Sequence, residues 1–77
     1  MDIDDIINRY GISVLVDNIK ILYRATNDID DANKTYDEYH KYITGVYDKD
    51  TYHIVIRLVD YDLGTCIRKF DSIEDKV

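Results

Sequence analysis

Residues 12–26 read ISVLVDNIKILYRAT, and their conformation determines the fold class of the chain. As a helix, the segment leaves Val14 and Ile21 outside its apolar stripe and contains many β-branched residues, which lower helix propensity. As a hairpin, it turns at Asp17-Asn18, two residue types that tolerate positive φ. The apolar pairs of that hairpin are Val16 with Ile19, Val14 with Ile21, and Ile12 with Tyr23. We favour the hairpin and retain the helix as the alternative.

Helical spacing precedes this segment. Apolar side chains recur at i, i+3, i+4 and i+7, at Ile3, Ile6, Ile7 and Tyr10. Asp2 is placed to cap the start of a helix, and Gly11 is placed to end it in a left-handed conformation. A short amphipathic first helix is therefore expected.

A second helix is expected to follow, from Asp30 or Asp31 to about Thr44. Its apolar face would carry Ala32, Tyr36, Tyr39 and Ile43, while most charged side chains fall on the other face. Gly45 is a plausible stop for this helix.

Alternating apolar residues then predict a strand from about Tyr52 to Val59. A turn at Asp62-Leu63-Gly64 leads into a last strand, Thr65 to Phe70. The sequence thus predicts one α+β domain over residues 1–77, in the order α-β-β-α-β-β, with residues 71–77 as a loosely ordered polar tail. One or two helices would cover one face of a small antiparallel sheet made of two hairpins.

The composition narrows the classes of function. The 77 residues include sixteen acidic and ten basic side chains, for a net charge of −6, which argues against direct binding of nucleic acid or anionic lipid. A single cysteine cannot form an internal disulfide, so a cytoplasmic protein is expected. No apolar run is long enough for a membrane span, and the N-terminus lacks the pattern of a signal peptide.

No motif indicates catalysis or a metal. The stretch Asp60-Tyr61-Asp62-Leu63-Gly64 begins like a calcium loop, but Gly64 stands at the fifth ligand position and Asp71 stands where a bidentate Glu is needed. His40, His53 and Cys66 lie outside any recognisable motif, and an enzyme would require one of them to meet an acidic partner in a pocket. We expect no enzyme, no cofactor and no metal site.

The acidic side chains are the strongest functional feature. Fourteen of the sixteen are Asp, whose short side chain holds its charge close to the backbone. The candidates for partner binding, as surrogates for phosphates, are Asp28, Asp30, Asp31, Asp37, Glu38, Asp48, Asp50, Asp60 and Asp62, with Tyr47 and Tyr61 as flat anchors. If the turns lie beside the start of the second helix, they form one negative face, with Tyr36 among its tyrosines, suited to a basic groove. The alternative is that Asp serves only in helix caps, turns and solubility.

The opening MDIDDII, the mixed α+β order and the acidic turns resemble the small acidic inhibitors that phages and prophages encode, of the anti-CRISPR or DNA-mimic type. The resemblance covers the general plan of the chain and transfers no individual residue. It implies a non-enzymatic inhibitor, acting in a bacterial host cell, that occupies the basic surface of a CRISPR effector or another nuclease.

Self-association is the alternative function. A core this small is marginal alone, and the expected strand from Tyr52 to Val59 is apolar on both faces through Val55 and Val59. Contact with a second copy, by sheet extension or helix packing, would cover the second face in a homodimer without nucleic-acid mimicry.

Overall fold

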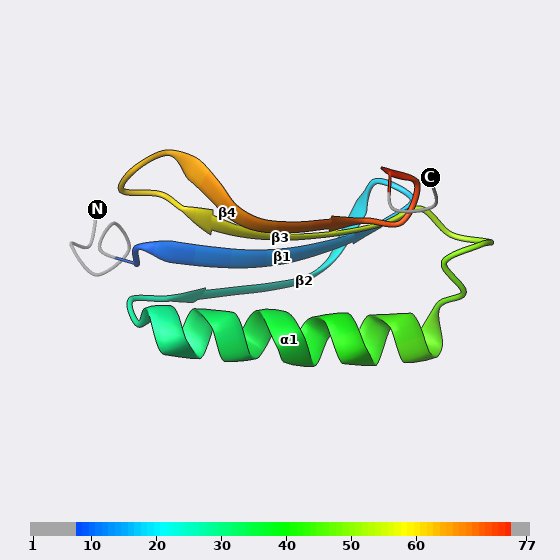
Figure 1. Ribbon diagram of the computed structural model, residues 1–77, viewed down its shortest axis with the longest axis horizontal. Coiled ribbons are helices and arrows are strands. Elements are labelled where there is room, and N and C mark those ends of the chain that lie inside the picture. Colours follow the sequence, from blue (N-terminus) through cyan, green and yellow to red (C-terminus); the bar gives the residue numbers. More distant parts are fainter. Residues whose placement is uncertain (1–7, 75–77) are drawn as a thin grey trace.

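The computed structural model describes residues 8–74, which form a four-stranded antiparallel sheet with one helix across one face (Figure 1). The elements are β1 (Tyr10–Val16), β2 (Ile19–Thr26), α1 (Ile29–Val46), β3 (Ile54–Asp60) and β4 (Thr65–Asp71). The strands lie in the order β2-β1-β3-β4, so the first strand of each hairpin occupies the centre. The α+β class is therefore confirmed, with the order β-β-α-β-β over these residues.

The first hairpin confirms the favoured reading of residues 12–26. Asp17 and Asn18 have φ of 52° and 69°, the left-handed pair that a two-residue turn requires. Val16 pairs with Ile19 across this turn, as expected. The helical alternative for the segment is wrong.

A register shift next to Val14 and Leu15 changes the remaining pairs of this hairpin. The observed partners are Val14 with Leu22 and Ile12 with Arg24. The predicted pairs with Ile21 and Tyr23 are wrong because the irregularity leaves Ile21 as an extra residue in β2. Side chains beyond it change face, so Tyr23 lies on the side of the sheet away from α1.

The predicted first helix is not matched where it can be compared. Residues 1–7 lie outside the described residues, but Tyr10 and Gly11, expected at the end of that helix, begin β1. Tyr10 pairs with Thr26 on one side and with Asp60 on the other. Ladders on both sides outweigh the helical spacing of the preceding isoleucines, and Gly11 does not act as a helix stop.

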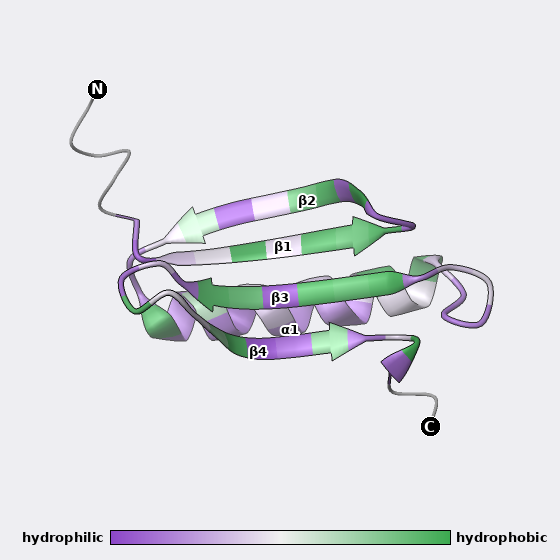
Figure 2. Ribbon diagram, turned by 90° about the horizontal axis from the view of Figure 1, so that it is seen from above, coloured by the Kyte–Doolittle hydropathy of each residue, from purple (hydrophilic) through white to green (hydrophobic). Residues whose placement is uncertain are grey.

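Helix α1 is positioned by its cap and its apolar face. Asp28 is the N-cap, and its carboxylate accepts a hydrogen bond from the Asp30 amide at 2.9 Å. The predicted face is confirmed: Ala32, Tyr36 and Ile43 are buried, and Tyr39 packs against them. The core beneath consists of Tyr10, Ile12, Val14, Val16, Ile54, Ile56 and Leu58. The central strands β1 and β3 are accordingly the most hydrophobic part of the sheet (Figure 2).

The second hairpin follows the prediction closely, with Gly64 at φ 66° in its turn. The predicted tail is packed at its beginning: Asp71 ends β4, and Ser72 is only 1% exposed. The Ser72 hydroxyl accepts a hydrogen bond from the Ile54 amide at 2.9 Å. Residues 75–77 lie outside the described residues.

Candidate interaction surfaces

The predicted acidic residues lie at both ends of the molecule and, for Asp37 and Glu38, in the middle of α1. The start of α1 and the turn between β3 and β4 lie at one end, and the segment from α1 to β3 lies at the other (Figure 1). Asp48 and Asp50 belong to that second segment, so they do not join the other candidates in one face. An 18-residue helix is about 27 Å long, which gives the scale of the separation.

At the first end, Arg9 joins the two acidic segments through backbone hydrogen bonds. Its amide donates to the Asn27 side chain at 2.8 Å, and its carbonyl accepts from the Tyr61 amide at 2.7 Å. Asn27 directly precedes the N-cap Asp28, and Tyr61 directly precedes Asp62. Arg9 therefore lies between the segment that leads into α1 and the β3–β4 turn, and holds both at the same end of the molecule.

Asp60 is the buried member of this group. Its side chain is 3% exposed and accepts hydrogen bonds from the Arg9 guanidinium at 3.0 to 3.2 Å. The amides of Asp62 and Leu63 donate to the same carboxylate. The bond to Arg9 holds the pKa of Asp60 below its ordinary value. Asp60 fixes the turn and is not available to a partner.

Two helix carboxylates are also paired within the chain. Asp31 lies 2.9 Å from Arg24 of β2, and Asp37 lies 2.9 Å from Arg68 of β4. These ion pairs tie α1 to the outer strands of the sheet. Among the predicted acids of α1 and its cap, Asp31 is half-buried, and Asp28, Asp30, Asp37 and Glu38 are exposed.

In the segment between α1 and β3, Asp48 accepts hydrogen bonds from neighbouring residues of the same turn. The Asp48 carboxylate accepts from the Asp50 amide at 2.9 Å and from the Thr51 hydroxyl at 3.0 Å. Its carbonyl also accepts from the amide of Tyr52 at 2.8 Å. These contacts close a turn, as expected for Asp in a loop.

The candidate tyrosines differ in how much of each side chain is exposed and accessible to a partner. Tyr36, on the core-facing side of α1, is buried, and Tyr47 is half-buried with its ring edge-on to Tyr52 at 5.2 Å between ring centroids. Tyr61 is 53% exposed, and its hydroxyl lies 3.1 Å from that of Tyr23. The Tyr61 ring lies over Gly11, where an added Cβ would be only 2.5 Å from the Tyr61 hydroxyl.

Tyr23 is a surface residue that sequence reasoning placed in the core. It is 47% exposed, and the hydrogen bond with Tyr61 raises its pKa to about 12. The bulge in β2 that places Tyr23 on the sheet face opposite α1 cannot be recognised from the sequence pattern. Leu63, 65% exposed in the same turn as Asp62, was also missed, although an apolar side chain inside a turn could have drawn attention to it.

We call the resulting surface the acidic end. Its members are Asp28, Asp30, Tyr61, Asp62 and Leu63, all of them exposed. It combines carboxylates with apolar and aromatic side chains, as in the anchors of protein interfaces.

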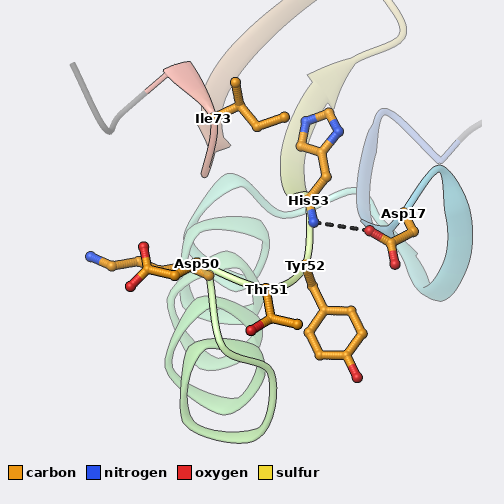
Figure 3. A pocket seen from close by; sticks show the side chains of 7 residues that line it. Asp17, Asp50, Thr51, Tyr52, His53 and Ile73 are labelled. Carbon is orange, nitrogen blue, oxygen red and sulfur yellow. Dashed lines mark hydrogen bonds between the residues drawn. The ribbon is translucent and has the colours of Figure 1, made fainter.

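A hollow of about 240 Å³ lies at the opposite end (Figure 3). Its lining comprises Asp17, Lys49, Asp50, Thr51, Tyr52, His53 and Ile73. The His53 amide donates to the Asp17 carboxylate at 3.0 Å, and the His53 ring contacts Asp71 at 3.0 Å. Burial works to raise the pKa of Asp71, but the Ile73 amide and His53 outweigh it and hold that pKa below its ordinary value.

Within residues 8–74, neither the Thr51 hydroxyl nor the Cys66 thiol is hydrogen-bonded to this histidine–aspartate pair. The Thr51 hydroxyl donates to Asp48 rather than to His53, and Cys66 donates to the Arg68 carbonyl in β4. Among residues 8–74, no three His, Cys, Asp or Glu side chains gather closely enough to hold a metal ion. No helix in this part of the chain is long and apolar enough to cross a membrane.

The sheet has a second surface, opposite α1, which we call the open face. Cross-strand register places Leu15, Val55 and Val59 on it, with Arg57 between the two valines. Val55 is 6% exposed and Val59 is half-buried, so β3 is apolar on both faces, as predicted, and it is a central strand of the sheet rather than an edge strand.

Comparisons of the chain with known protein families, with curated proteins and with solved structures found no match.

Proposed function

We propose that the protein is a non-enzymatic binding protein that inhibits a nucleic-acid-binding or defence protein by occupying its basic surface. The acidic end makes the contact, with exposed carboxylates against basic side chains and Tyr61 as the flat anchor. The protein binds no nucleic acid itself.

One observation carries this proposal. Asp30 and Asp62 come from different elements at the same end of the molecule, and both keep exposed side chains there, where Tyr61 and Leu63 are also exposed (Figure 1). Charged groups of this kind steer a basic partner into contact, and the apolar groups supply buried area once contact is made. Turn and cap chemistry accounts for Asp28, but it does not require Leu63 or Tyr61 to remain uncovered.

The ion pairs and positions of the predicted acids support a smaller set of binding residues for this proposal. Asp31, Asp37 and Asp60 are engaged in ion pairs with arginines of the same chain. Asp48 and Asp50 lie at the far end, and Glu38 lies on α1 between two lysines, Lys34 and Lys41, in sequence. The proposal therefore rests on a few exposed residues at one end of the molecule rather than on a long row of phosphate surrogates.

A pair of charge reversals at the acidic end tests the proposal. The D30K/D62K variant should no longer capture the basic protein that the wild type recovers from a bacterial extract. The matched control, E38K/D50K, makes the same change in net charge outside the acidic end and should recover it. Capture by both variants, or by neither, would contradict a site at the acidic end.

Self-association through the outer strands is the second candidate. β2 and β4 form the edges of the sheet, and Ile19 at the start of β2 is 66% exposed. Unpaired backbone groups along an edge strand can pair with a second copy. Sedimentation equilibrium at micromolar concentration decides this point, because a strictly monomeric protein removes the candidate.

A further inference from the structure

Positive charge lies on the open face of an otherwise acidic protein. Three exposed cations stand on this face by register, Lys20 on β2, Arg57 on β3 and Lys69 on β4. Within the four described strands, the one carboxylate on the open face is Asp71, which lies at the margin and contacts His53. The centre of the face therefore lacks a negative group of its own.

Arg57 and Lys69 form an unfavourable pair at this centre. They stand directly opposite each other on β3 and β4, where like charges destabilise a sheet. Lys69 has a partner in Glu74 at 3.5 Å, whereas Arg57 is exposed and forms no ion pair among residues 8–74. A carboxylate placed between these two cations would relieve the repulsion and give Arg57 a partner.

The acidic turn between β3 and β4 rises from the sheet on the same side (Figure 1). Gly11 faces away from the core, because both of its neighbours in β1 belong to the core on the α1 side. The Tyr61 ring lies over Gly11, so Tyr61 covers part of the open face. Asp62 and Leu63 follow in the turn, and both are exposed. One face thus presents cations in its middle and a carboxylate at its end.

A two-fold axis brings these opposite charges together in two copies of the chain. Arg57 and Asp62 are five residues apart, which is about 17 Å at the spacing of a strand. When two open faces meet with the axis across the strands, each strand lies over the same strand of the other copy. An axis halfway between Arg57 and Asp62 then places the turn of one copy over the gap between β3 and β4 of the other. That gap is where Arg57 and Lys69 stand opposite each other.

The row of open-face residues nearest this axis carries no charge. Cross-strand register aligns Ala25, Gly11, Val59 and Cys66 from β2 to β4. Val59 is half-buried and Cys66 is exposed, so small and apolar groups meet where the two copies lie closest. The Arg57 residues of the two copies lie about 17 Å apart along the strands, beyond the Debye length of about 8 Å at physiological salt. Face-to-face contact about this axis therefore keeps like charges apart.

We propose that two copies of the chain pack open face to open face about this axis, with Asp62 of each copy between Arg57 and Lys69 of the other. The contact is isologous, so it closes as a dimer and does not extend into a filament. It uses the face of the sheet and not the backbone groups of its edge strands. The dimer does not depend on the proposed function, but it covers Tyr61, Asp62 and Leu63, so a second copy would compete there with a basic partner.

The dimer is weak and reversible. Four strands about 4.8 Å apart and seven residues long present a face of about 450 Å², so two copies bury about 900 Å². Stable interfaces bury more than this, and the net charge of −6 on each copy opposes the encounter. We expect association at high micromolar to millimolar concentration.

Cys66 provides a direct test of the packing. It lies in the uncharged row at the axis, so a short bismaleimide should join the Cys66 thiols of two wild-type chains at high micromolar concentration. The matched control is Cys66→Ser/Glu38→Cys, which moves the single thiol of the chain to the exposed side of α1 and should cross-link only at the rate of random collision. Equal rates for the two proteins would overturn the proposal and leave the open face to an acidic segment of another protein.

A charge exchange tests the contacts of Asp62. Arg57→Glu and Lys69→Glu should each slow the cross-linking of Cys66 at least about tenfold, because like charges replace opposite ones. Adding Asp62→Lys to the double variant Arg57→Glu/Lys69→Glu should restore the rate. Lys34→Glu makes the same change in net charge on the exposed surface of α1 and should leave the rate unchanged. Cross-linking that persists in both Arg57→Glu and Lys69→Glu would overturn the assignment of these cations.

Capture of the basic partner separates this proposal from the proposed function. Arg57→Glu leaves Asp30 and Asp62 in place, so this variant should lose the cross-link and still recover the partner. Wild-type protein that recovers the partner without cross-linking through Cys66 would overturn the dimer alone. Wild-type protein that cross-links and recovers no basic partner would overturn the proposed function alone.

Discussion

Asp60 and Asp62 lie two positions apart and have different roles. Asp60 is buried and receives hydrogen bonds from Arg9 and from two turn amides, whereas Asp62 points its charge outward from the same turn. The Asp62 backbone is one of the donors that hold Asp60 in place. The Asp60 carboxylate thus stabilises the turn from which the Asp62 carboxylate is exposed to solvent.

The acid stability of the protein should depend on Asp60. Its folded pKa lies below the unfolded value of about 3.9, so its stabilising contribution is present above that pH and is lost as the pH falls through the folded pKa. Asp60→Asn should lower the melting temperature at neutral pH and flatten its decline in acid. Thermal unfolding followed from pH 7 downward measures both effects. Asp62→Asn is the control, and an equal loss in the two variants would contradict the role given to Asp60.

The contact between Tyr23 and Tyr61 can be read from titration. Tyr61→Phe removes the hydroxyl that raises the pKa of Tyr23, so that pKa should fall from about 12 toward the ordinary value of about 10. NMR signals of the labelled Tyr23 ring, followed through alkaline pH, give the measurement. An unchanged Tyr23 titration in Tyr61→Phe, with Tyr42→Phe as control, would show that the two rings do not meet in solution.

At the scale of elements, periodicity and turn chemistry were sufficient for most of the fold. Asp17-Asn18 and Gly64 identified both hairpin turns, and the spacing from Ala32 to Ile43 identified the buried face of α1. The register shift in β2 could not be predicted, because a bulge depends on how whole strands fit together. Tyr10 was misassigned for a related reason, since pairing with two neighbouring strands overrides local helical spacing.

The start of α1 depends on its cap. Asp28→Ala removes the carboxylate that accepts from the Asp30 amide and should reduce the free energy of unfolding by about 1 kcal/mol. Asp30→Ala removes an equal charge from the first turn but no cap, and should cost less than this. Urea unfolding of the two variants gives the comparison, and equal losses would argue against a specific cap.

At the scale of the whole molecule, net charge alone does not describe the surface. Half of the excess negative charge lies in residues 1–7, and several of the remaining acids are neutralised by Arg9, Arg24 and Arg68. The sequence identified Asp62 and Tyr61 as candidates. It could not show which carboxylates would meet arginines from distant strands, because ion pairs such as Asp37 with Arg68 depend on how α1 crosses the sheet.

The association rate of the captured partner, measured over a series of salt concentrations, tests the central claim most directly. Association with the wild type should slow as salt is added, because opposite charges steer the encounter. At low salt, D30K/D62K should associate at least about tenfold more slowly than wild type, whereas E38K/D50K should remain close to it. Association that is insensitive to salt, or slowed equally in the two variants, would contradict a binding site at the acidic end.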